Sequence, residues 1–236
     1  MRGENARLGV ETAPKSGHTA RSVTKHQSSS SIGLRHTAHA DRDILERSGV
    51  AMDSLPRNPP TVDDVREFRM TGPWQSKSGG ALHVPISLPY PQAMRFFDYD
   101  PVELGRIPVD IRGLRAFTVS DITAGGIGGM QFHRIRTEIS FVIKGKVSWR
   151  FEDLYGATRE ISWSPDNVLY MPPFVLHTMT SEEAGSALVT LANTLYIRDD
   201  PRTHDTYRAD VFHGMRDRFR GTGGLSDRPR VHTSLG

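Results

Sequence analysis

The sequence predicts an all-β domain, and two observations carry that prediction. Between Met94 and Ala192, short runs rich in β-branched and aromatic residues recur at regular spacing, with turn residues between them. Within this region Gly145 separates two such runs and indicates a tight hairpin. A chain of 236 residues suits one sizeable domain of this kind with extensions at its ends.

The expected strands follow one another through this region. They are Arg95–Tyr99, Leu114–Asp121, Gln131–Arg134, Glu138–Ile143, Lys146–Glu152, Arg159–Trp163, Val168–Met171, His177–Thr180 and Ala187–Ala192. Before them, we predict a short helix over Val62–Met70, capped by Thr61, and expect Trp74 and Leu82–Leu88 to pack against the domain. After them, we predict a helix over Asp205–Phe219 on the outside of the domain.

The composition divides the chain into four segments. Residues 1–51 contain eight Lys/Arg, five Asp/Glu and no aromatic residue, which predicts a disordered basic tail. Residues 52–93 form a Pro-rich arm, residues 94–195 the all-β domain, and residues 196–236 a C-terminal extension. Because Met52 begins a segment of different character, translation starting at Met52 is an alternative to Met1.

Charge and composition also bear on partners and location. The tail accounts for the net charge of +3 and lacks the dense basic blocks and interleaved aromatics of a nucleic-acid-binding arm. No apolar run approaches the roughly 20 residues of a membrane span, so we expect a cytoplasmic protein that binds neither nucleic acid nor membrane. Since the chain has no cysteine, any metal must be held by histidine, carboxylate or amide oxygen.

One pair of spacings points to a particular kind of all-β domain. Gly125-x5-Gln131-x-His133-x4-Glu138-x6-Gly145 is followed by Asp166-x5-Pro172-Pro173-Phe174-x2-His177. Together they resemble the two motifs of the cupin superfamily, G-x5-H-x-H-x4-E-x6-G and G-x5-P-x-G-x2-H. The resemblance implies a single jelly-roll barrel, and this chain keeps three of the four positions that hold metal ligands in most cupins.

The residues of these motifs can build a site inside a barrel. Gln131 and His133 share one face of a strand, Glu138 needs a turn before it to reach the same side, and His177 arrives from a third strand. With a metal present, His133, Glu138 and His177 would form a two-histidine, one-carboxylate site suited to iron, manganese, nickel or zinc, with Gln131 as a weaker ligand. Without one, the histidines line a pocket in which Glu138 orients an imidazole. The sequence leaves both interpretations open.

A closer resemblance comes from the segment Leu169-Tyr-Met-Pro-Pro-Phe-Val-Leu-His177-Thr-Met179. With Leu191-Ala192-Asn193 and Tyr196-Ile-Arg-Asp-Asp200, it is similar to the WxcM-like cupins, which include the nucleotide-sugar 3,4-ketoisomerases. The resemblance covers roughly residues 94–207. It implies a metal-free jelly roll that binds a dTDP-4-keto-6-deoxy-sugar and moves the carbonyl from carbon 4 to carbon 3 by proton transfers.

The chain departs from that family at its catalytic motif. The family's R-G-x-H-A-H is Gly128-Gly-Met-Gln-Phe-His133 here, so the first histidine is replaced by Gln131, which cannot transfer protons. We therefore expect an isomerase-like enzyme with His133 as base and His177 or Glu138 assisting. Gln131, Arg134, Arg136 and Met179 are the expected substrate-binding residues, and the two arginines would meet a diphosphate at the rim or else lie solvated.

The sequence also allows two alternative functions and predicts one oligomeric state. The first alternative is a metal-dependent cupin, such as a non-haem iron dioxygenase, that uses His133, Glu138 and His177. The second is a non-catalytic cupin that binds a small ligand. Because exposed β-rich edges favour pairing between copies, we expect a homodimer.

Overall fold

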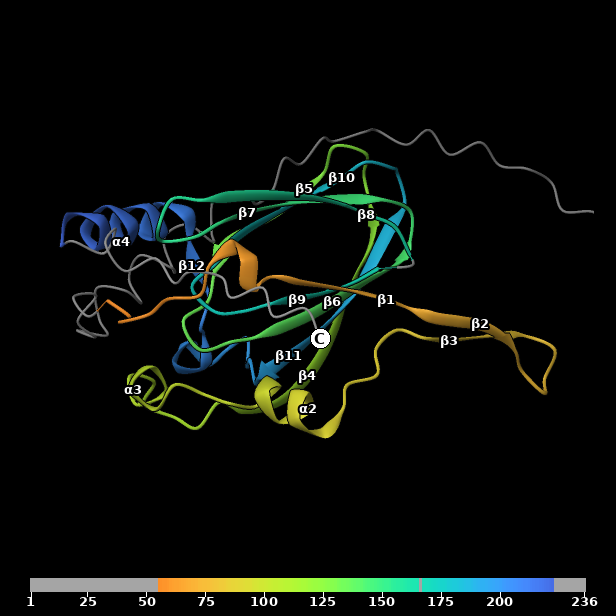
Figure 1. Ribbon diagram of the computed structural model, residues 1–236, viewed down its shortest axis with the longest axis horizontal. Coiled ribbons are helices and arrows are strands. Elements are labelled where there is room, and N and C mark those ends of the chain that lie inside the picture. The colour runs from red at the N-terminus through yellow and green to blue at the C-terminus, as the bar shows by residue number, and fades with distance from the viewer. Residues whose placement is uncertain (1–54, 166, 223–236) are drawn as a thin grey trace, which may run out of the picture. The chain divides into compact units, whose positions relative to one another are not determined.

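The computed structural model describes residues 55–165 and 167–222, so the tail predicted over residues 1–51, Met52 and Asp166 lie outside them. Within these ranges two five-stranded antiparallel sheets face each other, and a two-stranded hairpin stands beside them (Figure 1). The first sheet has the order β1-β9-β6-β11-β4, formed by Arg66–Arg69, Asn167–Met171, Glu138–Lys144, Ser186–Thr194 and Arg112–Ile122. The second has the order β12-β5-β10-β7-β8, formed by Tyr207–Arg208, Ile127–Phe132, Leu176–Ser181, Val147–Glu152 and Thr158–Trp163.

The connections between these strands make the pair of sheets a jelly roll. From β4 to β6, and again from β8 to β11, successive strands alternate between the two sheets. The sharp turn between β6 and β7 is made at Gly145, whose φ of 76° favours glycine. The prediction of an all-β jelly roll is confirmed. The hairpin predicted at Gly145 is wrong, because β6 and β7 belong to different sheets and pair with other strands, so the turn carries the chain from one sheet to the other.

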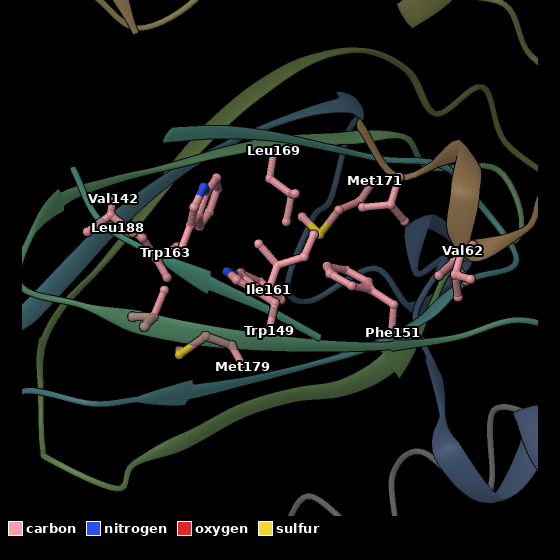
Figure 2. Packing of buried hydrophobic residues seen from close by; sticks show 13 residues of the cluster. Val62, Val142, Trp149, Phe151, Ile161, Trp163, Leu169, Met171, Met179 and Leu188 are labelled. Carbon is pink, nitrogen blue, oxygen red and sulfur yellow. The ribbon is translucent and has the colours of Figure 1, made fainter. Parts of the chain in front are cut away.

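The main hydrophobic core fills the space between the two sheets (Figure 2). Inward-facing side chains from both sheets pack together there with residues of the adjoining loops. The buried residues of this core are Val62, Val65, Val142, Val147, Trp149, Phe151, Ile161, Trp163, Leu169, Met171, Val175, Met179 and Leu188. Phe151 and Trp163 are fully buried. Burial of aromatic side chains of this size is a main source of stability in a small barrel.

Two helices cover the outer faces of the sheets (Figure 1). Helix α2 (Tyr90–Phe96) buries Phe96 against Ile139 and Val168 of the first sheet. Helix α4 (Ala209–Gly221) buries Phe212, Met215 and Phe219 beside Phe132 and Leu176 of the second. The predicted outer C-terminal helix is confirmed from Ala209 onward. Its predicted first four residues, from Asp205, are not helical, because the chain there pairs with β5 through Tyr207–Arg208. Among the described residues, no helix is long and apolar enough to span a membrane.

The prediction of a helix over Val62–Met70 is wrong beyond its first turn. A single 3-10 turn, η1 (Val62–Asp64), is capped by Thr61 as expected. The chain then enters β1, whose residues Arg66–Arg69 pair with β9 of the first sheet. Backbone pairing with a strand a hundred residues away thus overrides the local helical pattern, and it adds a strand from the Pro-rich arm to the barrel.

Two further expectations before the barrel are corrected. The strand predicted over Arg95–Tyr99 is absent: its first two residues end α2, and the other three form a turn and irregular structure. The helix begins beside Pro89 and Pro91, where fixed φ angles suit a first helical turn. Trp74 does not pack against the domain, because it lies half-exposed on the hairpin of β2 (Thr71–Gln75) and β3 (Ala81–Val84). Further along, Ile86 and Leu88 do contact the cluster around Phe96.

Two polar residues of the inner faces come from the edge strand β4 and from β5, which lies between β12 and β10. On β4, Arg115 pairs with Ala192, which also faces Glu138 on β6, so these three residues share the inner face. On β5, Gln131 pairs with the buried His177 and shares its face. Arg115 and Gln131 are nevertheless half-buried rather than buried. These two polar side chains are therefore less buried than His133, Glu138 and His177.

Candidate active site

The site is built around a crossover loop that carries the chain from one sheet to the other. Strand β5 ends at Phe132 and β6 begins at Glu138, and the two strands belong to different sheets. The carboxylate of Asp205 accepts hydrogen bonds from three successive backbone N–H groups, those of Arg134 (3.0 Å), Ile135 (2.9 Å) and Arg136 (2.7 Å). Because this loop interrupts the strand, His133 and Glu138 can both point into the barrel, which a continuous strand would not allow.

Asp205 holds this loop from a fully buried position. Burial raises the pKa of its carboxyl group, while the charge of Arg136 and the three backbone hydrogen bonds act in the opposite direction. A carboxylate that receives several N–H donors is a strong local organiser, because charge-assisted hydrogen bonds are about twice as strong as neutral ones. Sequence reasoning missed Asp205, which it had placed only at the start of the C-terminal helix.

His133 lies at the start of the loop with a defined orientation. Its Nδ1 donates to the backbone carbonyl oxygen of Asp205 at 2.5 Å, and because a carbonyl only accepts, Nδ1 carries the hydrogen. Its Nε2 is buried and has no hydrogen-bond partner within the described part of the chain. Burial, with the charge of Arg136, lowers the pKa of His133 well below its usual value. Nε2 therefore presents a free lone pair to the barrel interior.

His177 and Glu138 complete a cluster around that lone pair. His177, on β10, donates from Nδ1 to the carbonyl oxygen of Val175 at 3.2 Å, and burial lowers its pKa below the usual value. Glu138, the first residue of β6, places Oε1 3.6 Å from Nε2 of His133 and Oε2 3.9 Å from Nε2 of His177. The structure brings all three predicted catalytic residues together, each of them buried.

The cluster has the chemistry of a cation or proton site. One ligand atom from each of His133, Glu138 and His177 lies within 4.8 Å of the others. All three atoms present lone pairs, and acceptors facing one another in a buried place are favourable only when a proton or a cation lies between them. The residues present therefore fit either a shared proton or a divalent metal.

Two of the predicted substrate-binding residues lie on the inner face near the cluster. Gln131 faces His177 directly across the β5–β10 pair. Met179, two residues beyond His177 on β10, is only 5% exposed and belongs to the hydrophobic core beside Trp149. Gln131 thus lies at the accessible side of the cluster, whereas Met179 forms part of its apolar floor.

Neither predicted arginine lies solvated at the rim. Arg134 is 4% exposed and forms a bidentate ion pair with Glu103 of α3 (Pro101–Leu104), with Nε–Oε2 and Nη2–Oε1 distances of 2.6 and 3.0 Å. Its guanidinium lies over the ring of Phe174. Arg136 is equally buried but turns inward, with Nη1 3.3 Å from Oε1 of Glu138. No local pattern indicates this role for Glu103, because its partner lies 31 residues away.

A model of one known protein family matches the part of the chain that forms this site. The family model described as FdtA: WxcM-like, C-terminal matches residues 102–211, which include the crossover loop, all three clustered residues and Asp205. The resemblance inferred from the Pro-Pro segment is confirmed by this match. The matched region continues past residue 195 and includes β12 and the start of α4.

Solved structures similar to this chain include three ketoisomerases. QdtA, a sugar 3,4-ketoisomerase from Thermoanaerobacterium thermosaccharolyticum solved with TDP, is 19% identical with a TM-score of 0.45, covering 67% of this chain and 98% of its own. A 3,4-ketoisomerase from Helicobacter canadensis is 17% identical with a TM-score of 0.45, covering 65% and 98%. The TDP-quinovose 3,4-ketoisomerase WlaRB from Campylobacter jejuni is 16% identical with a TM-score of 0.45, covering 64% and 98%. No curated protein sequence matches the chain.

Proposed function

We propose that the protein isomerises a keto-sugar nucleotide by proton transfer, with His133 as the base. The observation that carries the proposal is the state of His133, whose Nδ1 is held by a backbone carbonyl while its Nε2 is neutral and without a partner in the described residues. A general base needs a free lone pair in a fixed position, and burial with Arg136 keeps that lone pair unprotonated. The substrate class follows from the WxcM-like resemblance.

The chemistry requires only protons to move. Nε2 of His133 would take the proton from carbon 3 of a 4-keto sugar while the carbonyl oxygen at carbon 4 gains a proton, which gives an enediol. Loss of the proton from the oxygen at carbon 3, with return of a proton to carbon 4, places the carbonyl at carbon 3. Glu138, 3.6 Å from Nε2, would stabilise the imidazolium formed in the first step. Gln131 offers an amide to hold a sugar oxygen but transfers no proton.

Solvent exchange tests this proposal directly. The protein is incubated in D2O with TDP-4-keto-6-deoxyglucose, the ligand of one similar structure, and deuterium at carbon 3 is followed by NMR. We expect incorporation by the wild-type protein and a loss of about 10²- to 10⁴-fold for His133→Ala. Because burial lowers the pKa of His133 below 6.5, the rate should be level near pH 7 and fall only at lower pH.

A matched control separates the base from a general effect of removing a histidine. His213 lies half-exposed on α4 beside Glu152, away from the cluster, and His213→Ala should exchange at the wild-type rate. Folding of each variant is checked by circular dichroism. Exchange by folded His133→Ala at the wild-type rate would remove His133 as base, and a folded wild-type protein that exchanges no deuterium would contradict the proposal.

A second candidate function is metal-dependent chemistry at the same cluster. The observation that favours it is the convergence of His133, Glu138 and His177, a donor set that suits iron, manganese, nickel or zinc. A bound divalent metal supplies Lewis acidity and, as iron, oxygen chemistry. In that case the carbonyls of Asp205 and Val175 would orient the two imidazoles through Nδ1, as such partners do for metal-bound histidines.

Metal content distinguishes the two candidates. For the metal-dependent protein, elemental analysis after growth in supplemented medium should find near one metal per chain, and His177→Ala should lower that value at least tenfold, with His213→Ala unchanged. A metal-free wild-type protein would eliminate this candidate. If the metal-free protein also exchanges no deuterium, ligand binding without catalysis is the function to test, through thermal stabilisation by nucleotide sugars. The homodimer predicted from the exposed edges is a separate prediction, tested by sedimentation.

A further inference from the structure

Two arginines with unused N–H groups lie on the inner face next to the reactive cluster. Arg115 of β4 faces Ala192, and Ala192 faces Glu138, so only a methyl side chain stands between the arginine and the glutamate positions. The guanidinium of Arg115 lies 5.0 and 5.1 Å from the ring centroids of Phe117 and Tyr196. These two aromatic contacts orient the group, while its buried Nε has no hydrogen-bond partner in the described ranges.

Arg136 approaches the same place from the crossover loop. Its Nε donates to Thr194 Oγ1 at 3.1 Å, and its Nη1 lies 3.3 Å from Glu138 Oε1. Its Nη2 is buried and, over residues 55–165 and 167–222, has no acceptor. A guanidinium that is 4% exposed and only partly satisfied is unusual, because burying a donor without an acceptor is unfavourable.

The two guanidiniums lie close enough to act on one another. Arg136 contacts Glu138 and also interacts with the charge of Asp205, whose carboxylate oxygens accept from three backbone N–H groups. Burial, followed by the charge of Arg136, lowers the pKa of Arg115, as expected for two neighbouring like charges. An oxyanion between the two guanidiniums would relieve this repulsion and accept both unused donors. Arginine suits this role because its planar fork matches carboxylate and phosphate oxygens.

We propose that Arg115 and Arg136 bind an oxyanion of the substrate, a carboxylate or a phosphate, immediately beside the proton-transfer cluster. The inference deepens the proposed function and rests on it for the identity of the reacting group. Arg136 contacts Glu138, and Glu138 lies 3.6 Å from His133 Nε2, so the anion would be bound close to the groups that transfer protons. The half-buried Arg115 and Gln131 mark the side from which such a ligand enters.

Binding of small anions tests the inference without turnover. Pyrophosphate and glucuronate, the phosphate and carboxylate probes, are titrated into the wild-type protein by calorimetry at constant ionic strength set with chloride. We expect saturable binding of at least one probe. Arg115→Gln should weaken it at least tenfold, Arg115→Lys should weaken it less, and the exposed Arg150→Gln on β7 should leave it unchanged. The preferred probe identifies the source of the oxyanion.

The outcomes separate this inference from the proposed function. Because Arg136 also binds Glu138 and Thr194, Arg115 variants carry the test and their folding is checked by thermal denaturation. Binding that persists unchanged in Arg115→Gln, or no saturable binding of either probe to the wild-type protein, overturns the inference. Arg115-dependent binding without deuterium exchange would support the anion site while contradicting the isomerisation.

Discussion

Replacement of Asp205 by alanine should destabilise the protein by about 3–5 kcal/mol, because three buried N–H groups would lose their acceptor at once. The crossover loop contains few other restraints of this kind. Equilibrium denaturation in urea measures the change, with the same slope expected if the denatured states are alike. We expect the effect to be larger than that of removing any single exposed carboxylate.

Two variants bracket this prediction. Asp205→Asn keeps an acceptor oxygen of the same shape and should lose less stability than Asp205→Ala. Asp210→Ala removes an exposed carboxylate that pairs with Arg208, and it should change stability by about 0.5 kcal/mol or less. If Asp205→Ala falls within the range of Asp210→Ala, Asp205 does not organise the loop.

The second large effect concerns the buried ion pair between Glu103 and Arg134. Glu103→Gln should destabilise the protein by about 3–5 kcal/mol, because it leaves the guanidinium of Arg134 charged and buried with a weaker partner. Denaturation in urea again gives the measurement. Since the pair fastens α3 to the crossover loop, its loss should also loosen the segment that carries His133.

The stability that the whole ion pair contributes differs from the stability lost when only one partner is removed. Replacing both residues by apolar ones of similar size, Glu103→Leu with Arg134→Met, should recover part of the stability, because the buried charge of Arg134 is removed with its partner. Recovery is incomplete, because Arg106, whose Nε lies 3.3 Å from Glu103 Oε2, loses that contact. A double variant that is less stable than Glu103→Gln would show that the ion pair stabilises the fold on balance. A Glu103→Gln protein as stable as the wild type would contradict the burial of Arg134.

The spacing of apolar residues was sufficient for most of the barrel strands. The predicted strands at Leu114–Asp121, Glu138–Ile143 and Arg159–Trp163 each lie within the observed β4, β6 and β8. Alternation with period two is a local property, so it can be read along the chain without knowing the partners. The motif spacing likewise pointed to His133, Glu138 and His177, which the fold brings together.

Prediction failed where the deciding contact lies far away in the sequence. Arg66–Arg69 forms a strand because β9 supplies its hydrogen-bond partners. The residues of that segment alone do not indicate this pairing. Arg134 was expected at the surface, since an isolated arginine is usually solvated, whereas its ion pair with Glu103 allows it to be buried. The sequence around Arg115 does not indicate a place in the site, because the inward direction of its side chain follows from the pairing of Arg115 with Ala192.

The sequence by itself determined the jelly-roll class and the residue types of the site, because strand periodicity and motif spacing are local. Only the tertiary structure decided which atoms face one another. His133 has a fixed tautomer because the carbonyl of Asp205, 72 residues away, lies against its Nδ1. Arg136 points inward because Glu138 and Thr194 receive its donors. Hydrogen bonds and charge pairs act over a few ångströms of space, whatever the distance along the chain.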